Sequence, residues 1–212
     1  MEISKYLIIP ILTVSSLQCG HKPTAPNNMG ALKSTDTALI LKTEEANPLK
    51  GKPITAKQLI IPGKSIGQAK VNESMEDVFN TLGRPDSSDA AMGSSLAVWY
   101  DNHNKAGYKT SIFARHNYNG NNEELQHVRK ILVTSPFFRT AESIGCGSTL
   151  SQIRKYYTLK KANSYKEKGK PIDVYSDVAK GIFFEIDPGL DKCVAVLVHK
   201  PNDEGSANIN MH

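Results

Sequence analysis

The sequence lacks the motifs that carry metal, nucleotide and serine chemistry. None of its six histidines stands in an H-E-x-x-H pattern, and none of its three cysteines stands in a C-x-x-C pair. His116 and His127 flank one expected turn, but a third metal ligand is not evident. The serine motifs G-x-S-x-G and S-x-x-K are missing, and the Lys-Ser/Thr pair of a phosphate loop does not follow Gly145 and Gly147. We therefore expect no metal ion, no cofactor and no catalytic residue.

A strong charge of one sign is also lacking. Lys and Arg number 26 against 21 Asp and Glu, which leaves a formal net charge of +5. The basic residues are scattered, apart from a run over residues 160–170. Such scatter is typical of a solvated surface, and an anionic partner is the alternative. Zinc-finger spacings, RNA-recognition motifs and basic heptads are missing, so we expect no nucleic-acid partner.

Long apolar runs are lacking except at the N-terminus. A mean hydropathy of −0.37 excludes a polytopic membrane protein. Residues 6–17 form one apolar run behind the basic residue Lys5, and this run is too short to span a bilayer. The pattern predicts a signal peptide over residues 1–18.

Cys19 follows this run directly and is the predicted site of lipidation. A cysteine that closes an apolar run resembles a bacterial lipoprotein signal, in which the thiol receives diacylglycerol and the cysteine becomes the new N-terminus. Ser16 and Gln18 stand where the usual signal has Leu and a small residue. The alternative is a plain secretory signal with an incidental cysteine. Lipidation at Cys19 would anchor the protein to a membrane of the cell envelope, and we expect the outer membrane, on its periplasmic side or at the surface.

If Cys19 carries lipid, Cys146 and Cys193 remain as two thiols, and export places them in an oxidising compartment. Such a pair is a disulfide candidate, and two buried free thiols are the alternative. Cys146 also precedes an expected helix start, where a thiol pKa falls. A remote hypothesis is therefore an enzyme with Cys146 as nucleophile and His199 as base. We expect no enzyme, because no third residue that would orient the base is evident.

Composition divides the rest of the chain into four parts. Residues 19–58 are rich in proline and polar residues, as in a flexible lipid-anchored tether. Residues 59–136 and 137–201 each combine a helix start with strand-like runs. Residues 202–212 form a polar tail that we expect to be disordered.

The first folded part contains the best-defined helix. Ser74 is its expected N-cap, Glu76 and Asp77 suit the helix dipole in the first turn, and Gly83 followed by Pro85 ends it. A weaker copy follows in the second part, where a T-x-x-Q capping box predicts another helix start; its residues are Thr149 and Gln152.

Three strand-like runs follow each helix. Their connections are too short for crossover helices, so an antiparallel sheet is expected. The runs are Ser94–Asp101, Lys109–His116 and Val128–Thr134 in the first part, and Pro171–Ser176, Gly181–Asp187 and Lys192–Lys200 in the second. The predicted fold class is α+β, with two tandem α-βββ repeats whose helices pack on antiparallel sheets.

The first helix start resembles a family signature. The pattern V-G-M-S-x-E-E-V-x-x-x-L-G-x-P belongs to the small outer-membrane assembly lipoproteins of the BamE-like, or SmpA/OmlA, group. Asn72 and Glu73 depart from it, and the matching positions are Val71, Ser74, Glu76, Asp77, Val78, Leu82, Gly83 and Pro85. The β-lactamase-inhibitor protein is similar in fold, as a tandem repeat. The resemblance implies a non-enzymatic envelope protein whose sheet or loops bind another protein.

Aromatic residues gather in the first predicted sheet. On a solvent-exposed face they would form a binding platform, and the alternative is that they complete the core. The platform candidates are Trp99, Tyr100, Tyr108, Phe113 and Tyr118. We thus expect a protein-binding lipoprotein of the cell envelope, acting in outer-membrane assembly or maintenance with an envelope protein as partner. A surface inhibitor or ligand-binding lipoprotein is the alternative.

Overall fold

The computed structural model describes residues 53–116, 125–203 and 211–212. Of these residues, 47% lie in strands and 10% in helices. The predicted signal peptide, Cys19, most of the predicted tether and Tyr118 lie outside the described residues. Within the described part, no helix is both long and apolar enough to cross a membrane.

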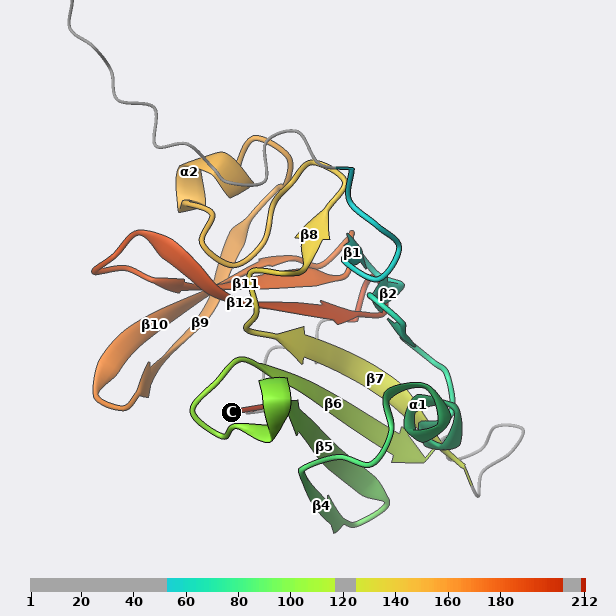
Figure 1. The fold of residues 1–212 in the computed structure, drawn as a ribbon. Helices are drawn as coiled ribbons and strands as arrows, with labels where there is room; N and C mark the ends of the chain where they lie inside the picture. The colour runs from blue at the N-terminus through green and yellow to red at the C-terminus, as the bar shows by residue number, and fades with distance from the viewer. Residues whose placement is uncertain (1–52, 117–124, 204–210) are drawn as a thin grey trace, which may run out of the picture. The chain divides into compact units, whose positions relative to one another are not determined.

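The main element is an eight-stranded antiparallel sheet (Figure 1). It consists of two four-stranded meanders that join where β7 pairs with β12, through contacts such as Val133 with Val196. In spatial order the strands are β4 (Ser87–Ala91), β5 (Ser94–Tyr100), β6 (Lys109–His116), β7 (Gln126–Val133), β12 (Lys192–His199), β11 (Ile182–Asp187), β10 (Lys170–Asp177) and β9 (Lys160–Glu167).

One face of this sheet is covered by short elements. They are the helices α1 (Met75–Leu82) and α2 (Leu150–Ile153) and the four-stranded sheet of β1 (Leu59–Ile61), β2 (Ser65–Ile66), β3 (Ala69–Lys70) and β8 (Arg139–Thr140). A 3₁₀ turn, η1 (Asp101–His103), follows β5. Strand alternation sends Ile112, Ile131 and Phe184 toward this covered face, where they are fully buried.

The opposite face carries a second, smaller apolar cluster. Its buried members are Leu132, Val174, Phe183, Ala195, Leu197 and Met211. The sequence predicts disorder for the tail at 202–212, yet Met211 is only 1% exposed. For this end of the tail the structure thus differs from the prediction.

The predicted fold class is wrong. The structure is mostly β, and the helices, of eight and four residues, are too small to form the helical layer of an α+β repeat. Each half of the large sheet has four strands where the prediction had three, because β4 and β9 were missed. All five residues of β4 are exposed, and β9 is exposed at nearly every position. Such edge strands bury no apolar residues and show no hydrophobic period.

The family resemblance is also contradicted. The strand-dominated architecture is not the BamE-like fold, and the tandem α-βββ arrangement inferred along with it is overturned by the same finding. The matching residues correspond only to the eight-residue helix α1, its caps and the residues directly beside it. Ser74 caps it by accepting from the Asp77 N–H at 3.1 Å, and Gly83 ends it at φ 77°.

The substitution Ser74→Ala is expected to lower the free energy of unfolding by about 1 kcal/mol, because the Asp77 N–H loses its acceptor. Urea unfolding followed by circular dichroism measures this change. Ser88→Ala, in the exposed edge strand β4, is the matched control and should shift the midpoint little. Equal losses in the two variants would contradict the capping role.

Candidate functional site

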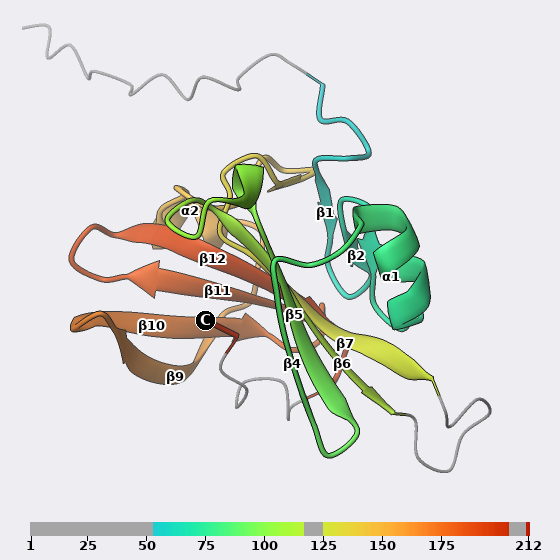
Figure 2. The same cartoon turned by 60° about the horizontal axis from the view of Figure 1, so that its bottom comes forward.

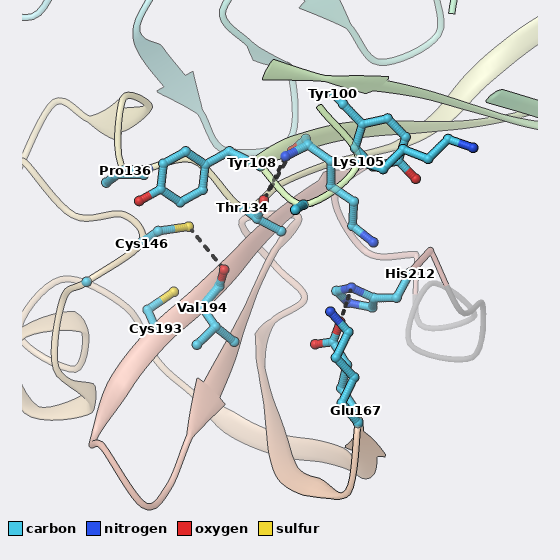
Figure 3. Close-up of a pocket in the computed structure, with 15 residues that line it drawn as sticks. Tyr100, Lys105, Tyr108, Thr134, Pro136, Cys146, Glu167, Cys193, Val194 and His212 are labelled. Atoms are coloured by element: carbon cyan, nitrogen blue, oxygen red, sulfur yellow. Dashed lines mark hydrogen bonds and ion pairs between the residues drawn. The ribbon is translucent and has the colours of Figure 1, made fainter. Parts of the chain in front are cut away.

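A groove opens where the two meanders diverge. Strand β7 ends at Val133, which pairs with Val196, so the first residues of β12 have no partner in β7. The groove has a volume of about 610 Å³. We call it the central groove; it is lined by Tyr100, residues 105–109, Thr134, Pro136, Cys146, Gly147, Glu167, Lys168, Cys193, Val194 and His212 (Figure 3).

The rim of the central groove is basic and aromatic. Lys105, Lys109 and Lys168 contribute three cations, against one carboxylate from Glu167. Burial lowers the pKa of Lys109, and the acidic residues Glu167 and Glu185 oppose this change. The Tyr108 ring is 49% exposed beside these cations. The rim can therefore take both apolar and anionic groups of a ligand.

Two thiols lie in the floor of the groove. Cys146 and Cys193 are 4% and 2% exposed, and both are free in the structure. Backbone hydrogen bonds hold their segments together: the Gly147 N–H donates to the Cys193 carbonyl at 2.7 Å, and the Cys193 N–H donates to the Ser148 carbonyl at 2.8 Å. The structure thus brings together the pair that the sequence names as a disulfide candidate, and it shows them as the buried thiols of the alternative.

Burial affects the reactivity of the Cys193 thiol. Burial, with the adjacent Cys146 thiol, raises the pKa of Cys193 well above its ordinary value. The Cys146 Sγ donates to the Val194 carbonyl at 3.5 Å. His199, the base of the enzyme hypothesis, lies six residues along the extended strand β12 from Cys193, which is roughly 20 Å.

A polar cluster lies on the sheet face opposite the helices. The Tyr165 hydroxyl donates to Glu185 Oε2 at 2.9 Å, and His212 Nε2 lies 2.7 Å from the same oxygen. The His212 Nδ1 is 3.7 Å from Glu167 Oε1. Burial and the Glu185 carboxylate together raise the pKa of Tyr165. Sequence reasoning missed this cluster, because its members come from three separate segments and share no spacing.

The predicted aromatic platform is divided between three places. Trp99 faces the helices, where its ring lies 6.3 Å from Phe79 and its Nε1–H donates to the Gly83 carbonyl at 3.1 Å. Tyr100 and Tyr108 line the central groove. Phe113 packs in the cluster on the opposite face. Of the platform candidates that the structure describes, the two tyrosines alone share a surface with the candidate site.

The two histidines of the expected hairpin form no metal centre in the described residues. The register pairs His116 with Gln126 and Arg115 with His127, so the two rings belong to neighbouring strands. His127 Nδ1 lies 3.2 Å from the Asn72 carbonyl. Across the described ranges, no group of three or more His, Cys, Asp or Glu side chains could hold a metal ion.

Comparison with known proteins adds little. No protein-family model matches the chain, and no curated protein matches it. Among solved structures, a similar chain is an extracellular protein containing a SCP domain from Bacillus anthracis str. Ames, with a TM-score of 0.42 and 14% identity. The match covers 64% of this chain and 45% of the other. A likeness this weak carries no argument about activity or location.

Proposed function

We propose that the chain is an exported, non-enzymatic protein-binding module, anchored to the cell envelope through lipid on Cys19. The central groove is its binding surface, and an envelope protein is its partner. The prediction of export comes from the N-terminal segment, where an apolar run leads into Cys19. The geometry of the groove supports the binding role.

The observation that carries the binding role is the exposed Tyr108 ring on a basic groove. Tyrosine is enriched at protein interfaces because it offers a large rigid area together with a hydroxyl group. Tyr108 remains 49% exposed even though Tyr100 and Lys109 also line the groove. Both thiols of the groove are buried, and burial raises the pKa of Cys193, which favours binding over covalent chemistry at that sulfur.

The substitution Tyr108→Ala is expected to reduce recovery of the partner at least tenfold, because the partner loses an aromatic anchor. Recovery is measured by affinity capture of the intact lipoprotein from detergent-solubilised envelopes, with quantitative mass spectrometry. Tyr156→Ala is the matched control, since Tyr156 is 47% exposed and lies outside the groove. The proposal fails if Tyr108→Ala and the wild-type chain recover the same proteins in equal amounts.

A second candidate function follows from the volume of the groove. About 610 Å³ lies within the range of small-molecule sites. A ligand-binding lipoprotein would place a small anion among Lys105, Lys109 and Lys168. A thermal-shift screen of small carboxylates and phosphates separates the candidates, because a small-molecule site gives a concentration-dependent rise in Tm.

A further inference from the structure

The last two described residues sit on the sheet as a bound peptide would. Met211 is 1% exposed and packs in the apolar cluster with Phe183 and Leu197. His212 Nε2 contacts Glu185 Oε2 at 2.7 Å and the Tyr165 hydroxyl at 2.9 Å. Figure 2 places this end of the chain beside β10. One buried apolar anchor and one polar side chain at a fixed acceptor are the usual elements of peptide recognition.

The receptor for this segment is built into the large sheet. Glu185, on β11, is 7% exposed, and a buried carboxylate requires hydrogen-bond donors. Tyr165, on β9, provides one donor, and His212 fills the adjacent position. The imidazole ring is tilted by 35° against the Tyr165 ring, at 5.6 Å between centroids. Without His212, the site would retain an acceptor for one further N–H donor.

The charges around this receptor select the kind of donor. Glu185 and Glu167 both approach His212, at 2.7 and 3.7 Å. Two carboxylates repel an acidic side chain and attract an imidazole or a cation. Lys109 interacts with both carboxylates and offsets part of their charge. Beside them, the anchor site takes a long flexible apolar side chain, which Met211 provides.

We propose that this end of the central groove is a docking site for a peptide segment of the partner, in which a large apolar residue is followed by an imidazole or cationic residue. The chain's own Met211 and His212 occupy the site in the structure. His212 also lines the central groove, so the two surfaces are continuous. The inference rests on the proposed function, because it describes the partner as a protein.

An intramolecular occupant competes with a partner segment. Its linkage to the same chain gives it an effective concentration on the order of millimolar. Removal of residues 211–212 should therefore open the site and increase the affinity for an external segment of the same chemistry. The chain's own residues 203–212, DEGSANINMH, provide such a segment as a defined probe.

The experiment measures fluorescence anisotropy of a labelled 203–212 peptide with two proteins, the full chain and the chain that ends at residue 210. We expect saturable binding to the shortened chain and at least tenfold weaker binding to the full chain. A peptide with Met211→Ser should bind the shortened chain at least tenfold more weakly. A scrambled peptide of the same composition is the matched control and should not bind.

A second receptor keeps the test decisive if the shortened chain does not fold. The full chain with Met211→Ser retains the segment but lacks its anchor, and it should bind the wild-type peptide. Glu185→Gln in that receptor should reduce binding of the histidine peptide. Equal binding of the scrambled peptide, or no binding to either opened receptor, overturns the docking site. If partner capture then still depends on Tyr108, the proposed function stands without it.

Discussion

Oxidation of Cys146 and Cys193 to a disulfide is expected to raise the free energy of unfolding by about 4 kcal/mol. The bond would close a loop of about 48 residues, and loop-closure entropy gives this magnitude for such a length. The paired backbone of Gly147, Ser148 and Cys193 already holds the two segments side by side. The Cys146 thiol would give up its contact with the Val194 carbonyl. This is the largest stability effect that we expect in the molecule.

Urea unfolding of the protein, after treatment with oxidised glutathione and with a reductant added or omitted, measures this effect. Each disulfide formed consumes two protein thiols and releases two molecules of reduced glutathione, so titration of the protein thiols after removal of glutathione reports the extent of the reaction. The matched control is the double variant Cys146→Ser and Cys193→Ser, whose midpoint should not depend on reductant. If the wild-type midpoint is also independent of reductant while both thiols titrate as lost, the loop-closure argument is wrong. Thiols that resist oxidation would instead exclude the bond.

The outcome also bears on the enzyme hypothesis. A disulfide would remove Cys146 as a nucleophile and leave the floor of the central groove as fixed apolar surface. Burial holds the pKa of Cys193 high, which makes this thiol a poor nucleophile. In either redox state the groove remains a binding surface in the proposed function.

Local rules gave correct predictions where one residue type decides the structure. Ser74 and Thr149 cap helices as expected, the latter with the reciprocal Gln152 contact of a capping box. Strand β6 has the predicted bounds of Lys109–His116, and β12 (Lys192–His199) lies within the predicted run Lys192–Lys200. In each case short-range hydrogen bonding or a buried apolar run determines the element, and both are visible in the sequence.

Prediction failed where pairing with a neighbour determines the structure. Residues 160–167 are mainly polar and basic, yet they form β9 because β10 offers a free edge, with pairs such as Tyr165 with Ile172. Likewise β4 pairs with β5 although its five residues are exposed. Nothing local favours a strand there. At Thr149 a local signal was present but did not determine the length of the element. The capping box starts a helix there, yet α2 ends after four residues.

The central groove arises from register and could not be predicted from the sequence. It exists because β7 stops at Val133 while β12 begins at Lys192, and no spacing in the chain encodes that offset. Of the platform candidates, Tyr100 and Tyr108 line the groove, whereas Trp99 packs against the cluster beneath the helices. Strand alternation predicts two faces without saying which one the helices cover. The contact of His212 with Glu185 is likewise not encoded in any sequence spacing.

Lys130 should make stability depend on pH in the alkaline range. It is 3% exposed on β7, its ammonium lies 5.9 Å from the Phe113 ring centre, and burial lowers its pKa to about 8. Between that pKa and the ordinary lysine value of 10.5, the unfolded state binds more protons than the folded state. Stability therefore rises with pH across this window, by at most about 3 kcal/mol, and is lowest below pH 8.

The substitution Lys130→Met is expected to stabilise the protein at pH 7 by about 2 kcal/mol, because a buried ammonium is replaced by an apolar chain of similar length. Loss of the attraction to Asp203 and to the Phe113 ring offsets part of the gain. The advantage of the variant should shrink as pH rises from 8 to 10.5. Urea unfolding of both proteins at each pH gives this difference directly.

Lys166→Met, on the exposed edge strand β9, is the matched control and should stay within about 0.5 kcal/mol of wild type at every pH. A difference between Lys130→Met and wild type that does not change with pH would mean that Lys130 keeps an ordinary pKa in the folded protein.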